Sequence, residues 1–168
     1  MKEKIYNYDN INEKDINNYI DRAKMIVEND QEELLFASTN NNYYLIGGHV
    51  GDGESFDECV VREIEEEAGV KIPIEKRTPF FSIKYYCKDY PKEGLNTRYI
   101  TNYYSIKYNL VPNLDKVNLT EGELNGGFKL EYIKKDKAID VLTESLKTCT
   151  KEVVVRDTID AVNIYLEK

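Results

Sequence analysis

The sequence predicts an α/β fold in a single domain, residues 1–168. Short apolar runs lie between polar turns in residues 22–50, and two longer runs with period-two alternation follow in residues 78–90 and 97–110. A glycine-rich turn and a short helix lie between these two sets of strands, and two segments with helical apolar periodicity close the chain. A chain of 168 residues buries about 70% of its unfolded surface and is of ordinary size for one domain.

Residues 1–20 form a polar N-terminal arm that is rich in Asn and Asp. We expect a short strand or an irregular segment that packs against the domain, and a homodimer contact is one use for it. From residue 22, the runs RAKMIVEN, ELLFAST and YYLIGGHV are rich in β-branched and aromatic residues. They predict three strands, two of which can form a hairpin, and the last strand leads into Gly47 and Gly48.

A helix is predicted from Phe56 to Ala68. Ser55 can cap its N-terminus, Glu58 completes a capping box three positions on, and Gly69 suits a left-handed stop after the last turn.

The last turns of this helix carry Glu63, Glu65, Glu66 and Glu67, where the helix dipole already places partial negative charge. At about 100° per residue, Glu65 falls opposite the apolar arc, whereas the other three lie on its edge and should be partly buried. Each close pair repels by roughly 3 kcal/mol at an effective dielectric of about 20. Because Arg62 alone cannot neutralise three carboxylates, we expect a hard divalent cation, Mg²⁺ or Mn²⁺, at this helix.

The pattern around the helix resembles the complete Nudix box, G-x5-E-x7-R-E-U-x-E-E-x-G-U, in which U is aliphatic. The matching residues are Gly48, Glu54, Arg62, Glu63, Glu66, Glu67 and Gly69. The motif, with its preceding loop, occupies residues 47–70. Gly51 and Ile46 depart from residues that many members carry beside the motif, which bears on details of the substrate loop.

The resemblance implies a Nudix-type α/β/α sandwich with a mixed β-sheet. It also implies a metal-dependent hydrolase that cleaves a phosphoanhydride bond in a nucleoside diphosphate linked to another moiety. Nucleoside triphosphates, dinucleoside polyphosphates and nucleotide sugars all stay open as substrates. A non-catalytic Nudix domain that senses a nucleotide and acts through a partner is the alternative, although the box is intact and no appended domain is visible.

The resemblance also assigns roles to residues of the motif. Arg62 and Glu54 are expected to pair with each other or with the motif glutamates, which fixes the loop and the helix. The expected metal ligands are the backbone carbonyl of Gly47 and the side chains of Glu63, Glu66 and Glu67.

Residues 110–132 contain Pro112 and several glycines and are interpreted as a long loop, followed by a strand FKLEYI. Glu121 and Glu123 lie in the region where many Nudix enzymes place another metal ligand or the general base. A solvated acidic turn is the alternative interpretation, and the sequence does not separate the two residues.

Other residues are candidate contacts to a substrate. Lys84 and Arg98 are candidate phosphate contacts, and His49 is either a phosphate contact or a solvent-facing loop residue. Aromatic side chains in the two long strands could stack on a base, although tyrosine also simply suits strands. These candidates are Tyr85, Tyr86, Tyr99, Tyr103 and Tyr104.

The end of the chain, residues 134–168, is predicted to hold two helices, KDKAIDVLTESL and EVVVRDTIDAVNIYL, that cover the sheet. A net charge of −8 argues against a duplex nucleic-acid partner, and no apolar window is long enough for a membrane span. The N-terminus shows no signal peptide, so a cytoplasmic protein is expected. Cys59, Cys87 and Cys149 show no paired spacing and are interpreted as plain buried thiols.

Overall fold

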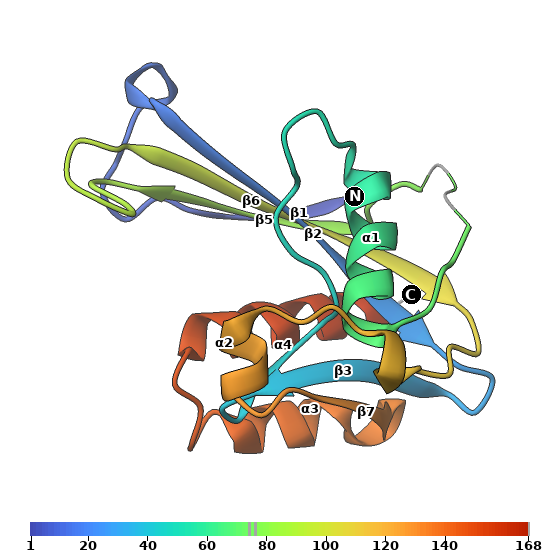
Figure 1. Ribbon diagram of the computed structural model, residues 1–168. Coiled ribbons are helices and arrows are strands. Elements are labelled where there is room, and N and C mark those ends of the chain that lie inside the picture. Colours follow the sequence, from blue (N-terminus) through green and yellow to red (C-terminus); the bar gives the residue numbers. More distant parts are fainter. Residues whose placement is uncertain (74, 76, 168) are drawn as a thin grey trace.

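The computed structural model describes residues 1–73, 75 and 77–167, so Lys168 of the expected C-terminal region lies outside the described residues (Figure 1). Seven strands form one sheet in the order β1-β5-β6-β2-β3-β4, with β7 beside β3. The strands are β1 (Lys2–Tyr6), β2 (Asn18–Glu28), β3 (Glu33–Thr39), β4 (Asn42–Tyr44), β5 (Phe81–Cys87), β6 (Thr97–Lys107) and β7 (Lys129–Lys134). The helices are α1 (Phe56–Ala68), α2 (Glu121–Asn125), α3 (Lys135–Ser145) and α4 (Glu152–Leu166), with short 3-10 turns at Glu13–Asp15 and Leu114–Lys116.

The sheet is mixed, as expected. β1 runs parallel to β5 and β2 runs parallel to β6, whereas β5 with β6, β3 with β4, and β3 with β7 are antiparallel pairs. β2 meets β3 at the pair Glu28 and Leu34. Two isolated bridges, Arg22 with His49 and Met25 with Ile46, join β2 to the segment after β4. The glycine turn is therefore held against the middle of the sheet.

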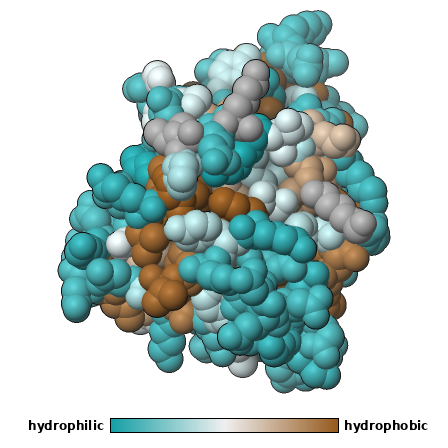
Figure 2. All heavy atoms as spheres, turned by 90° about the vertical axis from the view of Figure 1, so that its right-hand side faces the viewer, coloured by the Kyte–Doolittle hydropathy of each residue, from teal (hydrophilic) through white to brown (hydrophobic). Residues whose placement is uncertain are grey.

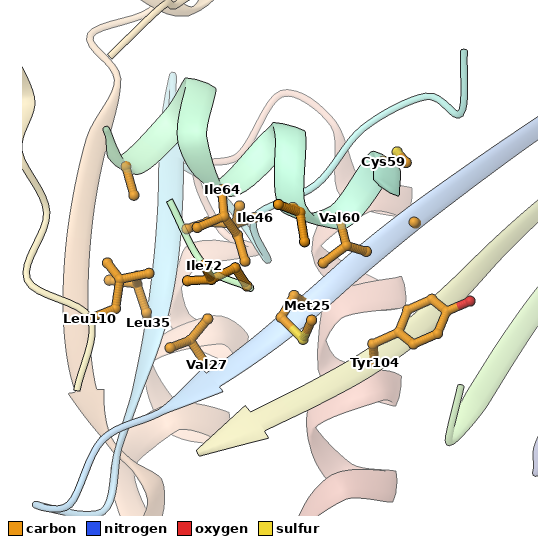
Figure 3. Packing of buried hydrophobic residues seen from close by; sticks show 13 residues of the cluster. Met25, Val27, Leu35, Ile46, Cys59, Val60, Ile64, Ile72, Tyr104 and Leu110 are labelled. Atoms are coloured by element: carbon orange, nitrogen blue, oxygen red, sulfur yellow. The ribbon is translucent and has the colours of Figure 1, made fainter. Parts of the chain in front are cut away.

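Helices cover both faces of the sheet, which confirms the predicted α/β/α sandwich. Alternate residues of β2 face opposite ways, as the period of a strand requires. Met25 packs with Val60 and Ile64 of α1, as Figure 3 shows, while Ile26 faces a second cluster that includes Leu142 of α3. The predicted bounds of α1, α3 and α4 agree closely with the structure.

Helix α1 begins and ends where its local signals place it. The Ser55 hydroxyl accepts a hydrogen bond from the Glu58 amide at 3.2 Å, and the Glu58 carboxylate accepts one from the Ser55 amide at 2.8 Å. Gly69 adopts φ +67°, and a Cβ there would lie 2.1 Å from the carbonyl oxygen of Asn113. Glycine is therefore required at this stop both for its backbone angle and for space.

Three segments differ in part from the sequence prediction. The N-terminal arm contains a short strand, β1, which was one of the two expected forms, but β2 begins at Asn18 and not at Arg22, so the arm is part of the sheet. The long loop of residues 110–132 contains the short helix α2, because Thr120 and Glu123 form a capping box. The third predicted strand is shorter than expected, since β4 ends at Tyr44 and the next residues turn towards β2.

The surface is largely polar on the face seen from the right of Figure 1. Figure 2 shows hydrophilic residues over most of this face, with hydrophobic residues in smaller patches between them. Among the described helices, none is long and apolar enough to cross a membrane.

Candidate active site

A cavity of about 530 Å³ lies beside the C-terminal half of α1. Its walls come from α1, from β2, from the turn between β3 and β4, from the glycine turn, from α2 and from the start of α4. The glutamates Glu63, Glu66 and Glu67 line it together with Gly47 and Gly48. Four of the five are therefore motif residues, and the fifth, Gly47, directly precedes the motif.

Glu67 is the most buried of the acids on this cavity wall, with 4% of its surface exposed. Its Oε2 atom has no hydrogen-bond partner among the described residues. Burial raises the pKa of Glu67, and the attraction of Lys24 opposes this shift only in part. A buried carboxylate oxygen without a partner is costly, so this atom is a strong candidate for a ligand to a cation.

Arg62 gathers the other acids of the motif. Its Nε and Nη2 atoms bind the two carboxylate oxygens of Glu54 at 2.8 and 3.0 Å, a bidentate pair. Its Nη1 atom donates to Glu63 at 2.8 Å and to Glu66 at 3.1 Å, and Nη2 also donates to the His49 carbonyl at 2.9 Å. The expected pairing of Arg62 with Glu54 is present, and it joins the loop to the helix.

Gly47 lies directly against β2. Its φ is +134°, and a Cβ would approach the Ala23 carbonyl oxygen to 2.1 Å. A side chain is therefore excluded on both backbone and steric grounds. The Gly47 carbonyl oxygen accepts a hydrogen bond from Lys24 Nζ at 2.9 Å, at the wall of the cavity.

Lys24 is a site residue that sequence reasoning missed. Its ammonium also donates to the Leu45 carbonyl at 2.9 Å and lies 5.0 Å from the centre of the Tyr44 ring. Burial lowers the pKa of this lysine, while the Glu67 carboxylate favours its charged form. The only local signal was a lysine inside the apolar run RAKMIVEN.

The chemical type of the donor atoms at this site fits a hard divalent cation. Carboxylates and a backbone carbonyl are the ligands that Mg²⁺ and Mn²⁺ prefer, and the Glu67 Oε2 atom lacks a partner. Within the described part of the chain, however, no three His, Cys, Asp or Glu side chains are gathered closely enough to hold a metal. The carboxylates of Glu63 and Glu66 accept hydrogen bonds from Arg62. If all three acids share one cation, Glu63 and Glu66 must therefore turn away from Arg62.

The comparisons with known proteins agree with this geometry. The family model described as NUDIX domain matches residues 19–137. The chain belongs to the Nudix family. It is therefore a Nudix pyrophosphohydrolase, and divalent metal ions are in general use in this family.

Solved structures of Nudix proteins share the fold. A MutT protein from Methanosarcina mazei superposes with a TM-score of 0.54 at 16% identity, covering 90% of this chain and 97% of that one. A NUDIX hydrolase from Nitrosomonas europaea gives a TM-score of 0.58 at 15% identity and 88% coverage of both chains. A MutT protein from Bacillus halodurans gives 0.52 at 20% identity, covering 73% of this chain and 72% of that one. At these identities the likeness concerns the fold alone.

The structure of this Nudix domain separates Glu121 from Glu123. Glu123 lines the cavity, and its Oε2 atom accepts hydrogen bonds from the Thr120 amide at 2.7 Å and the Thr120 hydroxyl at 2.8 Å. Glu121 is exposed in the first turn of α2 and is not part of the cavity wall. Of the two, only Glu123 is placed where it can meet a substrate.

Lys84 and Arg98 do not lie at this cavity. Lys84 pairs with Glu3 at 2.7 Å, and Arg98 lies 3.7 Å from Asp21. The expectation that they contact a substrate phosphate is therefore wrong for this site. Both are strand residues that pair with acids, on β1 and β2 respectively. Because these pairs join distant segments of the chain, the sequence does not reveal them.

The tyrosines proposed for base stacking are also outside the cavity wall. Two of them, Tyr103 and Tyr104, are core residues with 2% and 4% exposure. Another, Tyr85, donates a hydrogen bond to Asp157 on α4 at 2.6 Å, and Tyr86 donates one to Glu13 at 3.1 Å. The fifth, Tyr99, packs beneath the Arg22 guanidinium, 5.1 Å from it.

His49 and the cysteines complete the predicted residues. His49 is exposed at the rim of the cavity and accepts a hydrogen bond from Arg22 Nε at 3.2 Å, so it is both a loop residue and a wall residue. All three cysteines are free, but only Cys59 is buried. Burial raises the pKa of the Cys59 thiol to about 11, which keeps it protonated and unreactive.

Proposed function

We propose that this Nudix domain hydrolyses a phosphoanhydride bond in a nucleoside diphosphate linked to another moiety, with Mg²⁺ or Mn²⁺ as its cofactor. Nucleoside triphosphates, dinucleoside polyphosphates and nucleotide sugars are the candidate substrates. The observation that supports this most strongly is the buried Glu67 carboxylate on the cavity wall, whose Oε2 atom has no partner among the described residues.

Glu63, Glu66, Glu67 and the Gly47 carbonyl would hold the cation. When bound, it polarises phosphate oxygens and makes a water molecule more acidic. Because Glu67 has low exposure, bulk water does not compete with the cation for its carboxylate. Lys24, which now binds the Gly47 carbonyl, supplies positive charge at the same wall.

Arg62 and Glu54 act as positioning residues. The bidentate pair fixes the loop of residues 51–54 on α1, and the remaining guanidinium hydrogens hold Glu63 and Glu66 near the cavity. Such supporting contacts set the direction of metal ligands, and their loss commonly costs activity.

Glu123 is the proposed proton acceptor of the reaction. It lines the cavity, and its negative charge contributes to the raised pKa of Glu67. A water molecule would attack phosphorus, the bridging phosphoanhydride oxygen would leave with the electron pair of the broken bond, and the water proton would pass to Glu123. Glu121 has no part in this proposal.

The proposed partner is a small nucleotide, and no duplex nucleic acid or membrane is invoked. The homodimer contact through the N-terminal arm stays a prediction.

The proposal is tested with purified protein, Mg²⁺ or Mn²⁺, and a panel of nucleoside triphosphates, dinucleoside polyphosphates, nucleotide sugars and ADP-ribose. Chromatography separates the products. Metal-dependent cleavage of one class supports the hydrolase and identifies the leaving group. Metal-dependent nucleotide binding without cleavage across the panel would instead favour the sensing role.

A further inference from the structure

Three cations line the cavity without a close ion pair to a carboxylate. Arg22, Lys24 and Lys151 are wall residues, and none of them forms an ion pair within 4 Å among the described residues. Arg62, on the same wall, is by contrast saturated by three glutamates. Lys24 is attracted by the Glu67 and Glu63 carboxylates, so it serves the acidic side of the cavity. In a chain of net charge −8, the two remaining cations, Arg22 and Lys151, indicate an anionic ligand there.

Lys151 is set in place by a buried amide. Asn42 is 2% exposed, and its Oδ1 atom accepts hydrogen bonds from the backbone amides of Thr150 and Lys151 at 2.9 and 2.6 Å. Its Nδ2 atom donates to the Thr39 carbonyl at 2.8 Å. The start of α4 is thereby fixed to the turn between β3 and β4, and Lys151 is held at the cavity.

Arg22 is likewise oriented before any ligand arrives. Its Nε atom bonds to the His49 ring at 3.2 Å, and its guanidinium lies 5.1 Å from the centre of the Tyr99 ring. A stacked, planar guanidinium loses little freedom when it binds a phosphate oxygen.

The cavity offers little for stacking a base. Of the described tyrosine and phenylalanine side chains, Tyr44 alone lines it, and the Lys24 ammonium lies over that ring at 5.0 Å. The cavity wall also carries amide and hydroxyl side chains, among them Asn40, Asn118 and Thr120. Base recognition by aromatic stacking, which usually needs an open ring face, has no support here.

We propose that this cavity selects its substrate by a phosphoryl group outside the cleaved anhydride, bound by Arg22 and Lys151, and not by the base. This rests on the proposed function and narrows it to polyphosphate-bearing substrates, namely nucleoside triphosphates and dinucleoside polyphosphates, over nucleotide sugars. The reaction is the same hydrolysis, and the additional phosphoryl group contributes binding energy only.

The test compares Lys151→Ala with a matched control, Lys147→Ala. Lys147 lies on the same corner between α3 and α4 but pairs with Glu144 at 2.7 Å and does not line the cavity. KM and kcat are measured for ATP and for ADP-glucose. If one of the two is not turned over, its inhibition constant against cleavage of the other is measured instead. Isothermal titration with inorganic tripolyphosphate measures binding without turnover.

For Lys151→Ala, we expect KM for ATP to rise about tenfold, kcat to change less than twofold, and the constants for ADP-glucose to stay unchanged. Tripolyphosphate binding should weaken by a similar factor. Lys151→Arg should restore both, and Lys147→Ala should match the wild type. The wild type should cleave ATP, GTP, CTP and UTP with kcat/KM values within about threefold of one another.

Equal effects of Lys151→Ala on ATP and ADP-glucose, or no effect on either, would overturn the inference while leaving hydrolysis in place. A preference of more than tenfold for one base would overturn it as well. A third outcome is that the protein cleaves no compound of the panel but binds tripolyphosphate in a way that depends on Lys151. That result would refute the proposed function and support the anion site alone.

Discussion

Replacing Glu67 with glutamine removes one buried charge from the cavity wall and little else. The substitution preserves the size of the side chain, so the packing of α1 should survive. Glu67 is 4% exposed and its Oε2 atom has no partner among the described residues, so solvent cannot replace the lost carboxylate. We expect kcat to fall about a hundredfold or more, which corresponds to about 2.7 kcal/mol of transition-state stabilisation.

The same variant separates catalysis from folding. Because burial raises the pKa of Glu67, the folded protein binds more protons than the unfolded chain between the ordinary and the raised pKa. Stability is therefore lost as the pH rises through that window, and glutamine avoids this loss. In EDTA at pH 8, Glu67→Gln should melt no lower than the wild type, and the rise in Tm caused by Mn²⁺ in the wild type should be missing.

Glu65→Gln is the matched control on the same helix. The Glu65 side chain is 45% exposed and pairs with Lys71 at 3.2 Å. Steady-state kinetics and thermal denaturation of both variants should show wild-type behaviour for Glu65→Gln. Wild-type turnover in Glu67→Gln, or an equal loss in the control, would refute the reasoning.

Three further predictions follow from the same contacts. Arg62→Ala removes the cation that holds three carboxylates, so we expect kcat to fall tenfold or more and Tm to fall by about 2–8 °C. Arg62→Lys should recover only part of both, because lysine cannot form the bidentate pair, and steady-state kinetics and calorimetry measure the two effects. Glu123→Ala should lower kcat about tenfold and Glu121→Ala less than twofold, because only Glu123 lines the cavity, and wild-type kcat in both variants would end the proton-acceptor role. Burial raises the pKa of Asp157 from 3.8 to about 6, so its ionised form costs folding free energy above that pH. Asp157→Asn should stabilise the protein by about 2 kcal/mol at pH 7.5 and by almost nothing at pH 4 in urea denaturation, and a gain independent of pH would contradict this cause.

Local signals in the sequence predict much of this fold. The capping box of α1 joins residues three positions apart, and Gly69 directly follows the last residue of the helix. Both ends of α1 could therefore be predicted without tertiary contacts. The period of the helix also placed Glu63 and Glu67 at the edge of the buried face, where the structure has them. Alternation along β5 and β6 likewise predicted two neighbouring strands.

Contacts between distant segments account for what could not be predicted. Lys24 reaches the site because β2 lies against the glycine turn, 23 residues further along the chain. Lys151 reaches it through Asn42, 109 residues away. Lys84 and Arg98 pair with acids on other strands, which no local pattern shows.

One signal was present in the sequence and was not used. Thr120 and Glu123 have the spacing of a capping box, which predicts a helix start within the supposed loop. This box would have fixed Glu123 to the start of α2 and so separated it from Glu121. The structural role of the five tyrosines, by contrast, could not be recognised from the sequence, because strand preference and base stacking favour the same residue type.

The central claim is that the glutamates of α1 form a divalent metal site, and a titration with Mn²⁺ monitored by electron paramagnetic resonance tests it most directly. Free Mn²⁺ gives a strong signal that is reduced on binding, so wild-type protein and Glu67→Gln can be compared at equal concentration. We expect the wild type to bind at least one ion per chain and the variant to bind tenfold more weakly or worse. Equal binding by the two proteins, or none by the wild type, would contradict the assignment of the metal site to the Nudix motif of this chain.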